Sequence, residues 1–103
     1  VKSSGDNEIG DNVTLRYNAT IAKKCTIGRF SYLSPNVMTI YSEPDGTVLG
    51  GISIGCNCFI GSNSTIGSGV SICDKTIVGA MSYVNKSIEE KGTYIGTPAR
   101  RIK

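Results

Sequence analysis

The sequence has no histidine among its 103 residues. Histidine is the side chain that most often serves as a general base near neutral pH, and it is the commonest ligand of zinc. A zinc hydratase of the carbonic anhydrase type is excluded, because its metal needs histidine ligands. Cys56 and Cys58 are close in sequence, but no histidine is present to complete a zinc site around them. We expect no bound metal.

Long apolar segments are also absent. No stretch approaches the length of a membrane span, and no signal peptide is visible. The four cysteines are Cys25, Cys56, Cys58 and Cys73. We interpret all four as reduced thiols of a cytoplasmic protein, with Cys25 and Cys58 as packing residues.

Positive charge is missing from the middle of the chain. No Lys or Arg occurs between Phe30 and Asp74, although the net charge is +3 and the C-terminus carries Arg100, Arg101 and Lys103. Because no extended basic face with interleaved aromatics is present, nucleic acid is not an expected partner. The basic tail suits the phosphate groups of a small ligand, and a merely solvated tail is the alternative.

What the sequence does contain is an aliphatic residue at every sixth position. Neither an α-helix nor an ordinary strand requires a six-residue period, whereas a hexapeptide solenoid does. The first block is Ile9, Leu15, Ile21, Ile27 and Leu33, and the second is Val48, Ile54, Ile60, Ile66, Ile72, Val78 and Val84.

The other positions of the hexapeptide are sorted as well. The fifth position is small or β-branched throughout, and the members of this column are Val13, Ala19, Cys25, Ser31, Val37, Ile52, Cys58, Ser64, Val70, Thr76 and Ser82. One large and one small inward position suit a thin triangular prism, in which three hexapeptides close a coil of about 18 residues. The pattern predicts an all-β parallel β-helix of about four coils, with Ile9 stacked on Ile27, Leu15 on Leu33 and Ile54 on Ile72.

Two other β architectures fit the sequence poorly. A β-sandwich is disfavoured because its strands and turns do not recur at a constant spacing. An ice-binding solenoid needs threonines stacked on one face, but Thr14, Thr20 and Thr26 are one hexapeptide apart and fall on three different faces.

The period breaks after Leu33. Residues 39–47 include Pro44-Asp45-Gly46, which is turn chemistry, and we expect them to protrude as a loop from one corner of the prism. Such a loop is either functional or a tolerated insertion. Residues 85–91 are polar and are expected to leave the prism as a turn or short helix. We therefore divide the chain into a β-helix over residues 1–88 and a tail over residues 89–103 that packs on it.

Three segments of the sequence resemble one enzyme family. They are K-K-C-T-I-G-R-F-S-Y-L-S-P at 23–35, G-G-I-S-I-G-C-N-C-F-I-G-S-N-S at 50–64 and E-K-G-T-Y-I-G-T-P-A-R-R-I at 90–102. They are similar to the left-handed β-helix acyltransferases, and most of all to the bacterial sugar acyltransferases that use acetyl-CoA on nucleotide-linked amino sugars or sialic acid. The last segment is the most specific, because that family closes with a Gly-x-Pro-Ala-Lys/Arg tail. The resemblance implies a left-handed helix, whereas strand-crossover rules alone favour the right-handed form.

The resemblance also implies where the active site lies. The family has a general-base His followed by Glu or Asp where this chain has Lys23 and Lys24. A second family His, which contacts the acyl group, aligns with Tyr32. In the galactoside and xenobiotic acetyltransferases, whose protruding loop this chain resembles, the loop His would fall near Glu43. Lys23 would act as a base only if burial or Lys24 favoured its neutral form, and Glu43 only if it were desolvated.

The residues that the resemblance assigns to acetyl-CoA are better retained. The Gly50 N–H would face the thioester oxygen as an oxyanion-hole donor. The pantetheine would run between neighbouring prisms past Ser62 and Ala80. The adenine and phosphate end would lie at Thr97, Pro98, Ala99 and Arg100.

Two functions remain open. The first is an acetyltransferase that transfers the acetyl group of acetyl-CoA to a sugar amine or hydroxyl. The second is a non-catalytic hexapeptide-repeat protein with a degraded active site and a structural or regulatory role. In either case we expect a homotrimer with parallel prism axes, since so thin a prism buries little apolar surface and exposes strand edges at its ends.

Overall fold

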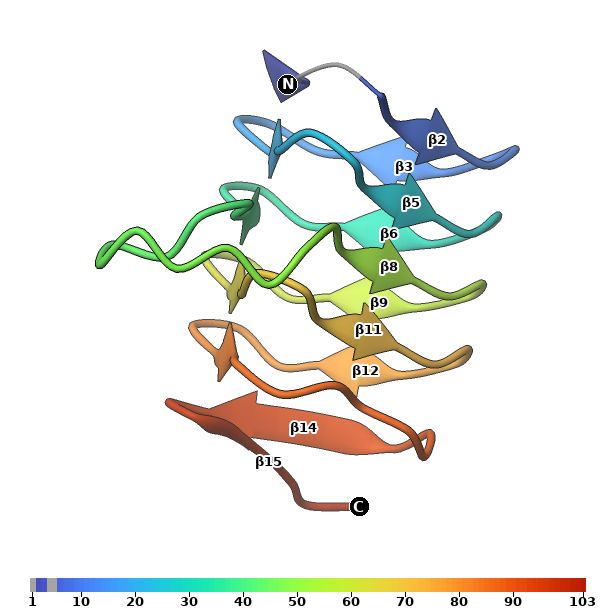
Figure 1. The fold of residues 1–103 in the computed structure, drawn as a ribbon. Coiled ribbons are helices and arrows are strands. Elements are labelled where there is room, and N and C mark those ends of the chain that lie inside the picture. Colours follow the sequence, from blue (N-terminus) through green and yellow to red (C-terminus); the bar gives the residue numbers. More distant parts are fainter. Residues whose placement is uncertain (1, 4–5) are drawn as a thin grey trace.

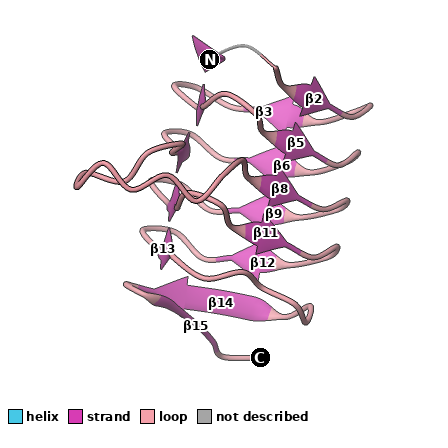
Figure 2. Ribbon diagram, in the orientation of Figure 1, coloured by secondary structure: helices cyan, strands magenta, loops and turns pink. Residues whose placement is uncertain are grey.

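The computed structural model of the protein describes residues 2–3 and 6–103, and every regular element in these residues is a β-strand. The chain winds from the N-terminus at the top to the C-terminus at the bottom through short strands joined by tight corners, so that successive coils lie directly on one another (Figures 1 and 2). One loop leaves the body near its middle, and a longer hairpin closes the C-terminal end.

The strands form three sheets that make the faces of a triangular prism. Sheet A has the order β1-β4-β7-β10-β13, sheet B the order β11-β8-β5-β2, and sheet C the order β15-β14-β12-β9-β6-β3. Every pairing is parallel except the terminal β14–β15 hairpin. The strands are β1 (Lys2–Ser3), β2 (Glu8–Ile9), β3 (Thr14–Leu15), β4 (Thr20–Ile21), β5 (Thr26–Ile27), β6 (Tyr32–Leu33), β7 (Met38–Thr39), β8 (Ser53–Ile54), β9 (Phe59–Ile60), β10 (Thr65–Ile66), β11 (Ser71–Ile72), β12 (Ile77–Val78), β13 (Tyr83–Val84), β14 (Thr93–Gly96) and β15 (Ala99–Arg101).

The stacking register agrees with the prediction from the six-residue period. Ile9 pairs with Ile27, Leu15 with Leu33, and Ile54 with Ile72. The threonines that begin β3, β4 and β5 lie on three different sheets, as their spacing predicted.

Both inward columns form the core. Apart from Val48, the aliphatic column is buried from Ile21 onward, and Leu33, Ile60 and Ile66 are 0% exposed. In the small column, Cys25 and Cys58 are buried among these aliphatic side chains, so their prediction as packing residues is confirmed. Burial raises the pKa of the Cys58 thiol, whose Sγ donates a hydrogen bond to the Cys73 carbonyl at 3.1 Å.

The position of the loop corrects the sequence analysis. Thr39 is 2% exposed and occupies the aliphatic column, because its Oγ1 donates to the Thr20 carbonyl and accepts from the Ala22 N–H. Val48, assigned from its spacing to that column, is 45% exposed. The inserted residues therefore lie between Thr39 and the strand that begins at Ser53, and we call residues 40–51 the loop.

The C-terminal part also differs from expectation. Residues 85–91 contain no helix, and Ile88 stays on the prism, where it is buried and forms a parallel bridge with Ile72. Strand β14 then extends sheet C by pairing with β12, and β15 folds back against β14. The basic end of the chain is thus part of a sheet.

Candidate active site

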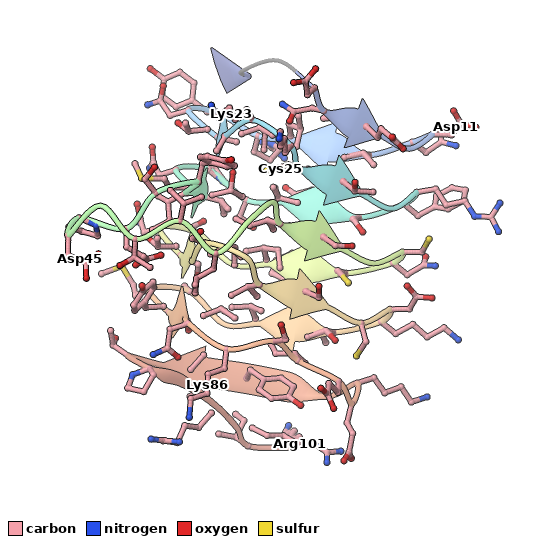
Figure 3. The ribbon with its side chains drawn as sticks, in the orientation of Figure 1. Asp11, Lys23, Cys25, Asp45, Lys86 and Arg101 are labelled. Atoms are coloured by element: carbon pink, nitrogen blue, oxygen red, sulfur yellow. The ribbon has the colours of Figure 1, made fainter. Side chains whose placement is uncertain are left out.

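The loop departs from the edge between sheets A and B. This A–B edge consists of the corners that follow the sheet A strands, at residues 22–25, 40–52, 67–70 and 85–87. The loop therefore lies between the corner that holds Lys23 and Lys24 and the corner that holds Ser68. Figure 3 shows Asp45 at the tip of the loop, outside the body of the prism.

Ser68 fastens both legs of the loop. Its Oγ donates to the Tyr41 carbonyl at 2.7 Å and accepts from the Leu49 N–H at 2.8 Å. The next N–H along the chain, that of Gly69, donates to the Gly50 carbonyl at 3.1 Å. Because Ser68 is only 3% exposed, these bonds form away from competing water. The base of the loop is consequently fixed, although its tip is exposed.

Glu43 points back from the loop onto the prism. Its Oε2 accepts from the Ser68 main-chain N–H at 2.8 Å, and its Oε1 accepts from the Tyr83 hydroxyl at 2.6 Å. The hydrogen bond between Tyr83 and Glu43 is the main cause that raises the pKa of Tyr83 above its ordinary value, and burial is the second. The predicted loop carboxylate is therefore held against sheet A.

The two lysines lie at the A–B corner of the coil that precedes the loop. Lys23 is exposed, and its Nζ lies 4.6 Å from the centre of the Tyr41 ring. Lys24 is also exposed, and a side chain at Gly51 would collide with its carbonyl oxygen. Gly50 and Gly51 can therefore pass directly over this corner.

Gly50 presents its backbone to the surroundings. Its φ of 118° favours glycine, and a Cβ added there would meet nothing within 4 Å. In the described part of the chain, its N–H has no hydrogen-bond acceptor. An open backbone donor held at the fixed base of the loop is suited to stabilise a developing oxyanion.

The residues predicted to contact CoA lie along a second edge, between sheets C and A. Ser62 and Ala80 are stacked in adjacent coils, since the Met81 N–H donates to the Ser62 carbonyl at 2.8 Å. One coil further, the Gly96 N–H donates to Ser82 Oγ at 3.1 Å, which places the turn of the terminal hairpin under the same edge. We call this row the C–A edge.

The hairpin turn carries the other predicted contacts. Thr97 and Pro98 connect β14 to β15, and Ala99 and Arg100 begin β15. Thr97, Pro98 and Arg100 are exposed, and Ala99 is half-buried. The order along the C–A edge is therefore Ser62, Ala80 and then the turn.

Tyr32 lies apart from both groups, on the outer face of sheet C. Its ring stacks on Phe59 with 5.3 Å between ring centres and 8° between ring planes. Its hydroxyl accepts a hydrogen bond from Arg16 Nη1 at 2.7 Å. Tyr32 is thus part of a surface ladder of aromatic side chains.

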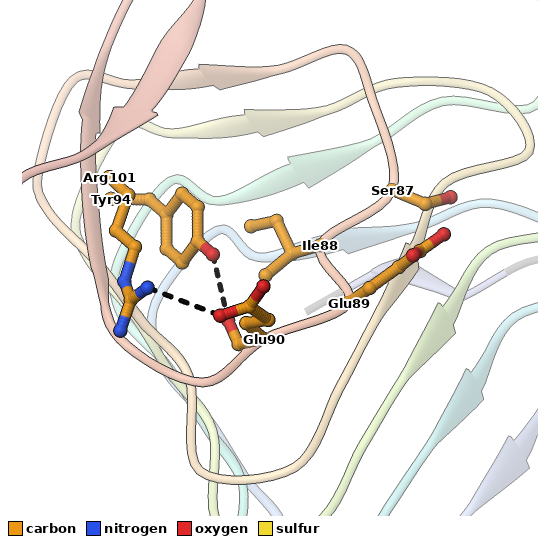
Figure 4. Close-up of a pocket in the computed structure, with 6 residues that line it drawn as sticks. All are labelled: Ser87, Ile88, Glu89, Glu90, Tyr94 and Arg101. Carbon is orange, nitrogen blue, oxygen red and sulfur yellow. Dashed lines mark hydrogen bonds and ion pairs between the residues drawn. The ribbon is translucent and has the colours of Figure 1, made fainter.

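Two hollows in the surface involve none of the predicted site residues. One, of about 230 Å³, lies near the terminal hairpin, where Arg101 pairs with Glu90 at 3.3 Å and the Tyr94 hydroxyl donates to the Glu90 carbonyl (Figure 4). The other, of about 410 Å³, lies beside β2 and β5. Among the described residues, no group of three or more Cys, Asp or Glu side chains is arranged to hold a metal ion. Within the same residues, no helix has the length and hydropathy to span a bilayer.

The structure therefore divides the predicted site residues into three places. Lys23, Lys24, Glu43 and Gly50 share the A–B edge, the predicted CoA contacts share the C–A edge, and Tyr32 lies on sheet C. Sheet A joins the two edges. Tyr83 on its outer face and Ser68 at its edge were missed by sequence reasoning; the only available signal was their place in the repeat, beside the corner where the period breaks.

Comparison with known proteins adds similarities of sequence and of structure to this geometry. Residues 51–86 match the family model described as the hexapeptide repeat of succinyl-transferase. The chain is 34% identical over 113 aligned residues to galactoside O-acetyltransferase of Escherichia coli (strain K12), covering 98% of this chain and 56% of that protein.

Solved structures show the same fold. A maltose O-acetyltransferase from Clostridium difficile 630 superposes with a TM-score of 0.85 at 28% identity, covering 96% of this chain and 59% of the other. A hexapeptide-repeat-containing acetyltransferase from Vibrio cholerae gives a TM-score of 0.85 at 26% identity, covering 95% and 62%. The chain thus spans somewhat more than half the length of these proteins, and its fold is the left-handed parallel β-helix of hexapeptide-repeat acetyltransferases.

Proposed function

Starting from this hexapeptide-repeat acetyltransferase fold, we propose that the protein transfers an acetyl group from acetyl-CoA to a hydroxyl or amine of a sugar. The observation that carries the proposal is the open Gly50 N–H, which lies on the same edge as a loop carboxylate. An oxyanion donor and a proton acceptor are the two groups that acyl transfer to a hydroxyl requires. The similarity to galactoside and maltose O-acetyltransferases supports a sugar acceptor.

We assign the C–A edge to the CoA chain. The row from half-buried Ser62 through exposed Ala80 to the hairpin turn offers a continuous track, and Arg100 supplies charge at its far end. Guanidinium groups bind phosphate well, because their planar donors match phosphate oxygens. Pantetheine would follow the corners, and the phosphates would meet the β14–β15 hairpin.

A second copy of the chain would complete the groove along this track. The outer face of sheet C, which borders the C–A edge, carries an exposed apolar row in which Phe59 is 44% and Ile77 46% exposed beside Tyr32. We assign this face to a trimer contact. Phe59→Lys should convert a trimer to a monomer in light scattering, whereas Phe30→Lys, at an exposed corner between sheets B and C, should leave it intact.

The experiment that tests the function measures binding and transfer separately. Acetyl-CoA should raise the melting temperature, as any ligand selective for the native state must. Arg100→Glu should reduce that shift and its dependence on salt, whereas Arg29→Glu, remote from the track at the corner between sheets B and C, should not. Acetylation of a β-galactoside or of maltose, followed by mass spectrometry, tests the reaction itself.

A non-catalytic role is favoured by one specific observation. Both oxygens of Glu43 are bonded inside the protein, and Lys23 and Lys24 are exposed. Acetyl-CoA binding without transfer to any acceptor would support a protein that keeps the prism but has lost the reaction. No melting shift at millimolar CoA would exclude both acetyl transfer and CoA binding.

A further inference from the structure

The hydrogen bond between Tyr83 and Glu43 connects two parts of the chain that are 40 residues apart. Tyr83 begins β13 on the outer face of sheet A, and Glu43 lies in the loop that follows β7, which is separated from β13 by β10 in the same sheet. At 2.6 Å between the two oxygens, the bond is in the short range of charge-assisted O–H···O hydrogen bonds. The pair is a candidate for proton transfer because a donor already points at an acceptor.

Neither group of the pair is free to turn away. Ser68 binds the second Glu43 oxygen through its main-chain N–H and fastens both legs of the loop through its hydroxyl. Gly67 lacks a Cβ, and one added there would come within 3.3 Å of Glu43 Oε2 and 3.4 Å of the Tyr83 hydroxyl. The prism therefore fits closely around the pair.

The same serine positions the oxyanion donor. Ser68 holds Leu49, and the adjacent Gly69 holds the Gly50 carbonyl, so the Gly50 N–H is fixed relative to Glu43. Tyr83 is half-buried and lies on the sheet that joins the Gly50 edge to the C–A edge. An acceptor held on the outer face of sheet A between these edges could contact the Tyr83 hydroxyl, which is bonded to Glu43.

On the basis of the proposed acetyl transfer, we propose that Tyr83 and Glu43 form a proton relay that replaces the missing histidine. The acceptor hydroxyl gives its proton to the Tyr83 oxygen while Tyr83 gives its own proton to Glu43 Oε1. The acceptor oxygen forms a bond to the acetyl carbonyl carbon, and the resulting oxyanion is stabilised by the Gly50 N–H. When the tetrahedral intermediate collapses, the carbon–sulfur bond breaks, and the proton returns from Glu43 through Tyr83 to the CoA thiolate. Tyr83 is the catalytic residue that touches the acceptor, and Ser68 is a positioning residue.

Tyr83 does not have to lose its proton beforehand in this relay. Glu43 and the nearby Asp45 are the acidic groups that raise the pKa of the phenol, so Tyr83 stays protonated near neutral pH. A protonated phenol is a poor base alone, but it can accept one proton while it releases another. The glutamate is the net base.

Two variants separate the relay from the structural role of these contacts. Tyr83→Phe removes the hydroxyl, and Glu43→Gln removes the proton acceptor but keeps the shape. The glutamine oxygen can still accept from the Ser68 N–H, and its NH₂ can donate to a reversed Tyr83 hydroxyl. Hydrogen exchange of residues 40–51 in Glu43→Gln should therefore stay as in the wild type. Tyr94→Phe is the matched control, because that hydroxyl bonds to Glu90 near the terminal hairpin.

The measurement is single-turnover acetyl transfer from acetyl-CoA to a β-galactoside and to maltose, together with the acetyl-CoA dissociation constant. General-base catalysis contributes about 10²–10⁴-fold, so both Tyr83→Phe and Glu43→Gln should slow transfer by that order, with binding unchanged. The solvent deuterium isotope effect of the wild type should be lost in Tyr83→Phe. Tyr94→Phe should transfer at the wild-type rate.

The outcomes distinguish the relay from the function on which it rests. If Tyr83→Phe or Glu43→Gln transfers the acetyl group at the wild-type rate, the relay is overturned but the proposed acetyltransferase activity stands. Slow transfer in Glu43→Gln accompanied by faster exchange in the loop would also overturn it, since loss of loop structure would then explain the rate. If the wild-type protein binds acetyl-CoA but neither acetylates the two sugars nor hydrolyses acetyl-CoA, the proposed acetyltransferase activity and the relay are both overturned.

Discussion

The edge between sheets B and C and the A–B edge of the same prism are built differently. At the B–C edge, each corner that follows β2, β5, β8 and β11 turns on one residue with a left-handed backbone: Asn12 at φ 58°, Phe30 at 61°, Asn57 at 57° and Lys75 at 62°. The A–B edge has the same turn at Asp6, with φ 64°, and at Lys24, with φ 59°, but its next corner is the loop. The corners of the B–C edge repeat one backbone turn, and side chains such as Ser31 add bonds between neighbouring coils. At the A–B edge, side-chain bonds of Ser68 and Glu43 instead hold an inserted loop, so the candidate site lies at this edge.

The largest effect should come from replacing an aliphatic side chain in the regular part of the prism. Ile60→Ala removes a fully buried side chain and should lower the free energy of unfolding by about 2–5 kcal/mol. Leu49→Ala, in the loop, removes a side chain that is 70% exposed and should change it by no more than about 0.5 kcal/mol. Urea denaturation of both variants measures the difference. Equal losses would mean that the loop is part of the cooperative core.

The same contrast explains what the sequence could predict. A column of aliphatic residues determines the strand register wherever coils follow one another, as at Ile9 and Ile27. It failed at the loop, because Thr39 fills the column through two hydrogen bonds instead of an apolar side chain. Val48 has the expected spacing from Leu33 but lies exposed in the loop. Apolar periodicity does not detect a polar residue that satisfies its own hydrogen bonds.

The candidate site was predictable to a smaller extent. The resemblance to a family placed Lys23, Lys24, Glu43 and Gly50 in a site, and the fold brings these residues to one edge. The partners of Glu43 were not predictable, because the repeat does not determine how a loop folds back on the prism. Tyr83 occupies a regular position of the repeat, and only its hydrogen bond to Glu43 indicates a functional role.

Two buried serines offer a second test of the comparison. Ser68→Ala leaves the Leu49 N–H and the Tyr41 carbonyl without their partner, at a cost of about 1–3 kcal/mol. That cost should appear as faster hydrogen exchange of residues 40–51. Ser31→Ala, at the B–C edge, breaks bonds to the Gly55 carbonyl and the Cys58 N–H and should lower global stability without loosening the loop. Faster exchange throughout the chain in Ser68→Ala would show that loop and prism open together.

Alkaline pH should destabilise the B–C edge through Cys58 and the loop contact through Tyr83. The pKa values of Cys58 and Tyr83 are both raised in the folded protein, the first by burial and the second by its bond to Glu43. Their contributions to stability are therefore complete below the unfolded pKa values of 9.0 and 10.0 and are lost as the pH rises through the higher folded values. In thermal melts between pH 8 and pH 11, the melting temperature should fall less steeply with pH in the two variants than in the wild type. The difference should begin near pH 9 for Cys58→Ser and near pH 10 for Tyr83→Phe. Unchanged slopes in both variants would contradict this assignment.

The smallest effect concerns the contact between Lys23 and Tyr41, which ties the first leg of the loop to the preceding corner of the A–B edge. A cation over an aromatic ring at an exposed site contributes about 0.5–1 kcal/mol, so Lys23→Met should speed hydrogen exchange in the loop by about two- to fivefold. Lys24→Met removes the same charge from the adjacent exposed residue, while Gly51 still packs on its carbonyl; it is therefore the matched control and should leave exchange unchanged. Equal effects of the two variants would show that net charge, rather than the ring contact, stabilises the loop.

The two lysine variants also test catalysis. If Lys23 only supports the loop, Lys23→Met should reduce acetyl transfer no more than it loosens the loop. A loss of about 10²-fold or more would identify Lys23 as the base and contradict the relay through Tyr83 and Glu43.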